Sequence, residues 1–284
     1  MSTSVRRLED QRFVTGTGTF IDDVSLDGQT HAAVLRSSRA HARIVSIDAS
    51  GARAAPGVLL IVTGKDWVAA GHSPIPTKTT VRTKRDGSPF NEPKRHCLAV
   101  DTVRHVGEPV ALVVAETQAE AEAALELIEV DYVELPAVAH QRAALGEGAP
   151  QLWAEAPGNL CLDFELGNRA AVEEAFARAD HVVSLDIANN RVAVAPLETR
   201  CALARYDAAS DRYFLHTPSQ GVFFIRDCLA EQVFHIRAEQ LDVVTGDVGG
   251  AFGMKIVPYP EHACVLWAAK VIGRPVLWVS ERSE

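Results

Sequence analysis

The sequence has no apolar run long enough to cross a membrane or to act as a secretory signal. None of its 284 residues lies in an uninterrupted apolar stretch of about 18 residues, the length that a membrane span needs. The N-terminal stretch MSTSVRRLEDQRF also lacks the apolar core of a signal peptide. These absences predict a cytoplasmic protein without a membrane partner.

Cysteines are few, and acidic residues outnumber basic ones. The five cysteines are odd in number, lie far apart and form no CxxC motif, which is typical of reduced, mostly buried thiols. The net charge of −9 argues against a general affinity for nucleic acid, because neutralising phosphates needs a basic surface. Neither a disulfide framework nor a nucleic-acid partner is expected.

Several common catalytic motifs are absent as well. There is no GxSxG, so a nucleophile elbow is not expected. There is no HExxH, and His262, which follows Glu261, has no partner at helical spacing. The ten histidines are scattered and fit surface positions or hydrogen-bonded core positions. The residues alone therefore identify no complete active site.

A glycine cluster is the most unusual feature that is present. Residues 246–255 read GDVGGAFGMK, with four of the chain's 19 glycines. Their spacing, GxxGGxxG, matches neither the phosphate-binding loop GxxxxGK[ST] nor the dinucleotide fingerprint GxGxxG. Because the cluster follows a predicted strand, its backbone N–H groups could still bind an anion. The alternative is a tight turn with Phe252 tucked into the core.

Local patterns predict mixed helices and strands in the first half of the chain. Residues 110–114 are an unbroken apolar run typical of a buried strand. Thr117 and Glu120 form a capping box for a helix over 118–128, and a further strand follows at 130–133. Other predicted elements are strands at 30–35, 44–47 and 58–63 and a short helix from Thr63 to near Gly71.

Two stretches of the first half are predicted to lack regular structure. Residues 72–96 form a long polar loop with six basic residues, which is either a partner surface or a solvated, mobile loop. Residues 139–160, rich in glycine, proline and small polar residues, are predicted to be a linker.

The second half is predicted to alternate strands and helices around the glycine cluster. A turn is expected at 207–211. Strands are predicted at 181–188, 191–206, 212–217, 241–245 and 277–280, and helices at 221–234 and 261–271.

Five stretches, in order along nearly the whole chain, resemble the large, molybdenum-binding subunit of the xanthine dehydrogenase, aldehyde oxidase and carbon monoxide dehydrogenase family. The similarity is strongest to the bacterial carbon monoxide dehydrogenase-like branch. Each motif is weak alone, and their order makes the resemblance specific. The stretches are RRLEDQRFVTGTGTFIDDV (6–24), HVGEPVALVVAET with EVDYVELPAV (105–138), NRVAVAPLETRCALARYD (190–207), HTPSQGVFFIRDCLA (216–230) and GDVGGAFGMK (246–255).

The resemblance implies an α+β fold of two domains. Residues 15–138 would be the a/b hammerhead domain, and residues 150–284 the first, incomplete part of the molybdopterin-binding domain. The implied cofactor is molybdenum–molybdopterin, in the cytosine dinucleotide form. Iron–sulfur clusters and FAD would be carried only by partner subunits.

The resemblance also implies which residues approach the cofactor. Gly250, Ala251, Phe252 and Gly253 would lie beside it, and the side-chain amide of Gln220 would approach the molybdenum centre. Gln220 and Phe252 would thus be neighbours of the metal without binding it directly. Glycine suits such a position because it lets backbone N–H groups come close to a ligand.

Four departures from the family pattern qualify this picture. Ala251 stands where many relatives have glycine, and we expect it to adopt a negative φ. Ile256 stands where purine-oxidising members have a glutamate, which argues against a purine substrate. The second molybdopterin domain and the general-base glutamate are not matched, so no catalytic residue is assigned, and Glu198 is interpreted as structural. The sequence stops one predicted strand after a helix, which suggests that the molybdopterin-binding domain is interrupted.

Two hypotheses of function follow. In the first, the chain is part of a molybdopterin-dependent hydroxylase or dehydrogenase that oxidises an aldehyde, an N-heterocycle or carbon monoxide with water as the oxygen source. It would act only with the C-terminal half of the large subunit and with iron–sulfur and FAD subunits. In the second, the chain is a non-catalytic remnant or an assembly or binding module without cofactor.

Overall fold

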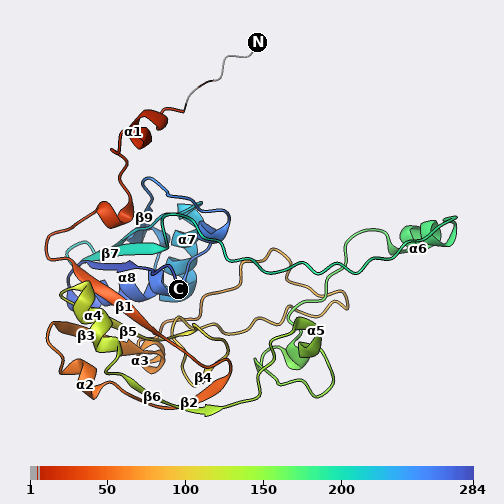
Figure 1. Ribbon diagram of the computed structural model, residues 1–284, viewed down its shortest axis with the longest axis horizontal. Helices are drawn as coiled ribbons and strands as arrows, with labels where there is room; N and C mark the ends of the chain where they lie inside the picture. The colour runs from red at the N-terminus through yellow and green to blue at the C-terminus, as the bar shows by residue number, and fades with distance from the viewer. Residues whose placement is uncertain (1–4, 6) are drawn as a thin grey trace.

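The computed structural model describes residue 5 and residues 7–284. Two β-sheets and their covering helices form the body, and a long excursion with helix α6 (Arg169–Ala177) at its far end projects from it (Figure 1). We call residues 160–195 the arm. The combination of mixed sheets and helices confirms the expected α+β class.

A seven-stranded mixed sheet joins the two halves of the chain, in the order β3-β5-β1-β10-β7-β8-β9. The pairs β1–β10 and β8–β9 are parallel and the others are antiparallel. The strands are β1 (Thr30–Arg36), β3 (Val58–Thr63), β5 (Pro109–Ala115), β7 (Cys201–Asp207), β8 (Arg212–His216), β9 (Leu241–Val244) and β10 (Val276–Val279). The β1–β10 pair therefore links residues from the two ends of the sequence.

A smaller antiparallel sheet has the order β4-β2-β6. Its strands are β4 (Thr102–Val103), β2 (Ala42–Asp48) and β6 (Glu129–Glu134). The predicted strand–helix–strand unit is confirmed as β5, α4 (Gln118–Leu125) and β6. The capping box is also present, since the Thr117 hydroxyl accepts from the Glu120 N–H and the Glu120 carboxylate accepts from the Thr117 N–H.

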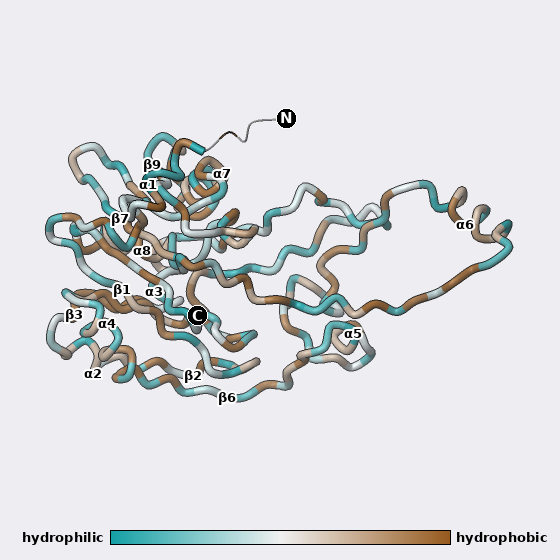
Figure 2. The backbone as a smooth tube through the Cα atoms, turned by 45° about the horizontal axis from the view of Figure 1, so that its top comes forward, coloured by the Kyte–Doolittle hydropathy of each residue, from teal (hydrophilic) through white to brown (hydrophobic). Residues whose placement is uncertain are grey.

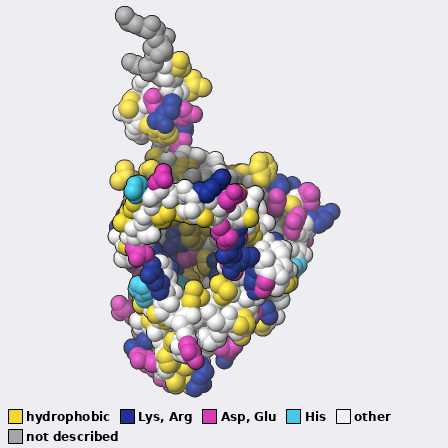
Figure 3. Space-filling view, turned by 90° about the vertical axis from the view of Figure 1, so that its right-hand side faces the viewer, with side chains coloured by type: hydrophobic (Ala, Val, Ile, Leu, Met, Phe, Trp, Pro, Cys, Tyr) yellow, Lys and Arg dark blue, Asp and Glu magenta, His cyan; other side chains and the backbone are white. Residues whose placement is uncertain are grey.

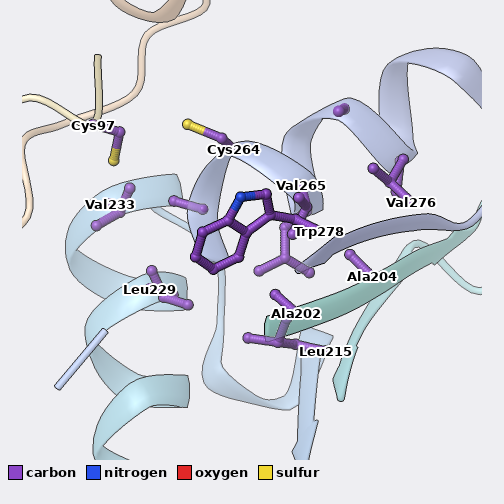
Figure 4. Close-up of a cluster of buried hydrophobic side chains, with 14 of the residues drawn as sticks. Cys97, Ala202, Ala204, Leu215, Leu229, Val233, Cys264, Val265, Val276 and Trp278 are labelled. Atoms are coloured by element: carbon purple, nitrogen blue, oxygen red, sulfur yellow. The ribbon is translucent and has the colours of Figure 1, made fainter. Parts of the chain in front are cut away.

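The main core lies between the large sheet and helix α8 (Pro260–Ile272). Trp278 of β10 sits in its middle, surrounded by Leu229, Val265 and Leu215 (Figure 4). Strand β5 is buried along its whole length because β1 and β3 pair both of its edges and its side chains pack into core clusters on both faces of the sheet. The five cysteines are free thiols, and all but Cys161 are buried, as expected.

The predicted helix at 221–234 forms, but its geometry changes midway. Helix α7 (Val222–Asp227) continues into a π-helical segment, η3 (Cys228–Phe234), and His235 ends it at φ 56°. Several shorter elements complete the fold. They are helices α1 (Asp10–Val14), α2 (Ser50–Arg53), α3 (Gly64–Ala69) and α5 (Gln141–Ala144), and 3-10 turns η1 (Ile21–Asp23), η2 (Pro157–Asn159), η4 (Ala238–Gln240) and η5 (Met254–Ile256).

The strand predicted at 181–188 is wrong, and so is the first part, 191–200, of the strand predicted at 191–206. Residues 178–200 run without regular structure, and only the end of the second prediction becomes strand β7. A strand needs a neighbour to pair its backbone N–H and C=O groups, and the described chain places no strand beside residues 178–195 (Figures 1 and 2). Helix α6, which the sequence reading missed, is capped by the Asn168 side chain.

The basic loop 72–96 contacts the start of the arm. Its backbone bonds the start of the arm, with Arg85 N–H donating to Asp163 O at 2.8 Å and Asn91 N–H donating to Cys161 O at 2.9 Å. The Arg85 guanidinium also pairs with the Asp163 carboxylate at 2.8 Å. The loop therefore braces the base of the arm, a role that sequence alone did not indicate.

His262 of helix α8 is buried, and its imidazole is protonated only at low pH. The His262 Nδ1 accepts from the Tyr259 N–H, and its Nε2 lies 3.2 Å from the Thr217 hydroxyl. That hydroxyl donates to Cys201 O, so a neutral imidazole with its proton on Nε2 satisfies all three groups. Burial, with a smaller contribution from Arg200, lowers the pKa of His262 to about 3.

This histidine should make stability depend on pH. The unfolded chain takes up the proton near pH 6.5, whereas the folded chain does so only near pH 3. The free energy of unfolding should therefore fall as the pH drops below 6.5, by about 3 kcal/mol at pH 4. Urea unfolding at a series of pH values measures it.

The matched variants are His262→Gln and His181→Gln. The first should flatten the pH dependence, leaving the smaller contribution of His72, whose pKa burial lowers to about 4. The second changes an exposed residue of the arm and should leave the dependence as it was. Equal slopes for His262→Gln and the unsubstituted chain would contradict the assignment.

Candidate functional site

The glycine loop and Gln220 meet at one edge of the large sheet. The loop, residues 245–253, follows β9, and Gln220 lies just beyond β8. Because β8 and β9 run parallel, their carboxyl ends lie at the same edge, a common place for ligand sites in open sheets. The two motifs that the sequence singled out are thus neighbours in space.

Gln220 is fixed to the loop at both its backbone and its side chain. Its Oε1 accepts from the Gly253 N–H at 2.9 Å, and its own N–H donates to Lys255 O at 3.0 Å. With Oε1 used as an acceptor, the amide orientation is defined by this bond. The Nε2 group, which has no acceptor among the described residues, is left as an oriented donor at the surface.

The loop leaves a row of backbone donors free. The N–H groups of Gly250, Ala251 and Phe252 have no acceptor within the part of the chain that the structure describes. Gly250 has φ 101°, Phe252 φ 49° and Gly253 φ 89°. Successive N–H groups in such a path form a concave anion-binding surface, so the loop and the Gln220 amide together offer donors to an oxygen-rich, anionic group.

Two of the glycines are required by close packing. A Cβ on Gly249 would lie 2.5 Å from the Cβ of Glu198, and one on Gly250 would lie 3.0 Å from the Cβ of Pro196. Ala251 is not among the residues with positive φ, as expected from its side chain. The loop therefore tolerates a side chain at 251 and excludes one at 249.

A buried ion pair between Lys255 and Glu198 holds the loop in place. The Lys255 Nζ lies 2.8 Å from Glu198 Oε2 and also donates to Glu198 O at 3.0 Å. The same Oε2 accepts from the Gly249 N–H at 2.9 Å, and the Glu198 N–H donates to Gly249 O at 3.1 Å. Glu198 thus bonds to Gly249 in the middle of the loop and to Lys255 just after its end, in line with the structural role expected for it.

Phe252 does not lie in the core, so the tucked-in alternative is wrong. Its side chain is 77% exposed, and its ring edge lies close to Gly250. The positive φ of Phe252 turns the chain so that the side chain points away from the body. An exposed ring in this position is available for contact with a bound group or with another polypeptide.

A polar hollow lies beside the start of the loop, at residues 245–248, where residues of the N-terminal segment also line it. Its volume is about 590 Å³. Asp247 closes the contact by accepting from the Arg12 guanidinium at 2.6 Å and from the Thr19 N–H at 2.8 Å. His216 also lines the hollow, and burial lowers its pKa. Sequence reasoning missed these residues, because Arg12 and Asp247 are 235 positions apart.

The described residues show no cluster of three or more histidine, cysteine, aspartate or glutamate side chains that could bind a metal ion. They also include no helix that is long and apolar enough to cross a membrane.

Two family models match the chain. The model described as "Aldehyde oxidase and xanthine dehydrogenase, a/b hammerhead domain" matches residues 15–136, and the model described as "Molybdopterin cofactor-binding domain" matches residues 152–284. The chain belongs to the molybdenum hydroxylase large-subunit family. Its fold is accordingly a hammerhead domain followed by part of a molybdopterin-binding domain.

Relatives in this family are similar over almost the whole chain. The nicotine 6-hydroxylase large subunit of Paenarthrobacter nicotinovorans is 37% identical over 99% of this chain and 33% of its own length. The carbon monoxide dehydrogenase large chain of Afipia carboxidovorans is 33% identical over 100% of this chain and 35% of its own. The chain thus spans about a third of the length of these curated relatives.

Solved structures show the same similarity. The crystal structure of quinoline 2-oxidoreductase from Pseudomonas putida 86 is 38% identical, with a TM-score of 0.85 over 98% of this chain and 34% of that chain. This chain is therefore similar to quinoline 2-oxidoreductase in both sequence and fold.

The glycines provide a matched test of the loop. Gly249→Ala should destabilise the protein by about 1–3 kcal/mol, because the new methyl group overlaps Glu198. Gly253→Ala enters open space and should cost only the strain of a positive φ, about 1 kcal/mol. Denaturant unfolding of both variants measures the difference. A smaller loss for Gly249→Ala than for Gly253→Ala would contradict this packing.

Phe252 should contribute little to stability. Since its side chain is exposed, Phe252→Ala should change the free energy of unfolding by less than about 0.5 kcal/mol. Trp278→Ala, in the middle of the core, should cost about 3–5 kcal/mol and is the comparison variant. A loss of several kcal/mol for Phe252→Ala in urea unfolding would show that the ring is buried.

Proposed function

We propose that this chain supplies one wall of the molybdopterin site in an oxidoreductase of the molybdenum hydroxylase family. The observation that carries the proposal is the set of free donors at the glycine loop. Three consecutive backbone N–H groups, at residues 250–252, and the Nε2 of Gln220 have no acceptor among the described residues. Donors of this kind fit the oxygens of an anionic molybdenum–pterin group.

In this proposal the chain binds and orients the cofactor. The backbone of Gly250, Ala251 and Phe252 would donate to its oxygens, while Gln220 would donate through Nε2 and keep its Oε1 bond to Gly253. The exposed ring of Phe252 would lie against the group. When bound, the molybdenum–pterin group supplies the redox chemistry, and the protein supplies position and electrostatics.

The remaining parts of the activity are proposals that rest on the family. We expect oxidation of an aldehyde, an N-heterocycle or carbon monoxide with water as the oxygen source. Ile256, in place of the glutamate of purine-oxidising members, favours a substrate other than a purine. We expect the cytosine dinucleotide form of the cofactor, which release of CMP on acid hydrolysis would test.

We also propose the partners and domain limits that the sequence suggested. The general base would come from the rest of the large subunit, and electrons would pass to iron–sulfur and FAD subunits. The domains would be 15–138 and 150–284, which the extents of the two family models support. A chain that never binds molybdenum, even with these partners, would instead be the non-catalytic module of the second hypothesis.

Gln220 allows the donor to be tested apart from the fold. Gln220→Glu keeps an oxygen for the Gly253 N–H but removes the Nε2 donor, and Gln220→Ala removes both. In the complex with the remaining large-subunit polypeptide, both variants should lower oxidation activity about 10-fold or more, with no change in the melting temperature. Molybdenum content measured by metal analysis gives a second readout. Full activity in Gln220→Glu would show that the donor is not used.

A further inference from the structure

The N-terminal motif at residues 6–24 is not used by the proposed function, although part of it reaches the glycine loop. We call residues 7–19 the strap. The first part of the strap lies outside both family models, which match residues 15–136 and 152–284. Its helix α1 stands out from the body in Figure 1, and the space-filling view in Figure 3 shows the same projection at the top of the molecule.

The strap gains little from apolar packing. None of its residues is buried, and the side chains of Leu8 and Val14 are 95% and 80% exposed. Ordering such a segment costs conformational entropy, and burial of its own side chains does not offset this cost. Specific polar contacts are therefore needed to hold the strap in place.

Within the described residues, every hydrogen bond from the strap to the body ends at one carboxylate. The Arg12 guanidinium donates to Asp247 Oδ1 at 2.6 Å, and the Thr19 N–H donates to Asp247 Oδ2 at 2.8 Å. The Thr19 carbonyl also lies against Gly246, where an added Cβ would come within 3.5 Å of it. The strap is thus fastened to the first residues of the glycine loop.

Asp247 needs these partners in turn. Its side chain is only 8% exposed, and burying a carboxylate without partners is strongly unfavourable. The strap supplies a charged donor to one oxygen and a backbone donor to the other. Loss of the strap therefore favours a different position of Asp247, in which water reaches the carboxylate.

A different position of Asp247 would change the free donors of the loop. Between residues 247 and 253 the loop is tied to the rest of the chain at three points: the strap holds Asp247, and side-chain oxygens of the body accept from the N–H groups of Gly249 and Gly253. The free N–H groups at residues 250–252 lie between the last two points. Because Gly249 is only two residues beyond Asp247, movement at Asp247 reaches the first of these donors.

We propose that the strap positions the glycine loop, and that Arg12 and Asp247 are positioning residues for the cofactor site. Their ion pair holds the start of the loop so that the N–H groups at 250–252 face the bound group together. Both residues act through the loop rather than by contact with that group. The inference rests on the proposed function for the identity of the group, but not for the order of the loop.

Hydrogen exchange of the full chain without cofactor tests the effect on the loop. Arg12→Gln keeps a polar side chain but removes the charge, and it should speed exchange of the bonded Gly249 and Gly253 amides about tenfold or more. Arg12→Lys keeps the charge and should give a smaller increase. The amides of β5, in the buried part of the large sheet, should exchange as in the unsubstituted chain.

Arg39→Gln is the matched control. The Arg39 side chain is 49% exposed, against 44% for Arg12, and pairs with the Glu134 carboxylate at 3.0 Å. Because Glu134 belongs to β6 of the smaller sheet, this variant should leave exchange in the glycine loop unchanged.

Two exchange results would overturn the inference. One is an Arg12→Gln variant in which exchange rises only within residues 13–19, since the ion pair would then hold the strap and nothing else. The other is an equal effect of Arg12→Gln and Arg39→Gln on the Gly249 and Gly253 amides.

Metal analysis separates this inference from the proposed function. In the complex with the remaining large-subunit polypeptide, Arg12→Gln should lower the molybdenum content at least about threefold, and Arg39→Gln should not. Molybdenum at the unsubstituted level in Arg12→Gln would overturn the positioning role alone. Absence of molybdenum from the unsubstituted complex would overturn the proposed function, while the exchange measurement would still decide whether the strap orders the loop.

Discussion

The buried ion pair between Glu198 and Lys255 is the contact on which the site depends. The Lys255 ammonium is 1% exposed and lies 2.8 Å from Glu198 Oε2. Removing one partner of such a pair leaves an uncompensated buried charge, which is strongly destabilising. Because the same carboxylate oxygen accepts from the Gly249 N–H, the pair sets where the glycine loop runs and so where its free N–H groups point.

The pair also joins the site to the arm. Glu198 follows the returning segment of the arm directly, whereas Lys255 follows the glycine loop. The second carboxylate oxygen of Glu198, Oε1, is buried without a hydrogen-bond partner among the described residues.

Local sequence patterns correctly predicted those elements that depend only on neighbouring residues. Strand β3 was predicted with its observed bounds, and the capping box at Thr117 formed as expected, because both depend on neighbouring residues. The strand predicted at 181–188 failed because a strand depends on a partner, and the partner is not in the described chain. Family resemblance pointed to Gln220 and to the glycine loop, but not to the hydrogen bond between Gln220 Oε1 and the Gly253 N–H. The Arg12–Asp247 pair joins residues 235 positions apart and has no local signal.

The shared sheet argues that the two family domains fold together here. Strands β1 and β10 pair in parallel, and Arg36 at the end of β1 reaches Glu261 of α8 at 2.7 Å. Arg200 approaches the other oxygen of that carboxylate at 3.4 Å, and Glu261 is buried. A hammerhead domain without β10 would expose the edge of β1, and α8 without Arg36 would bury a weakly paired acid. The glycine loop is therefore carried on a body to which both halves of the chain contribute strands.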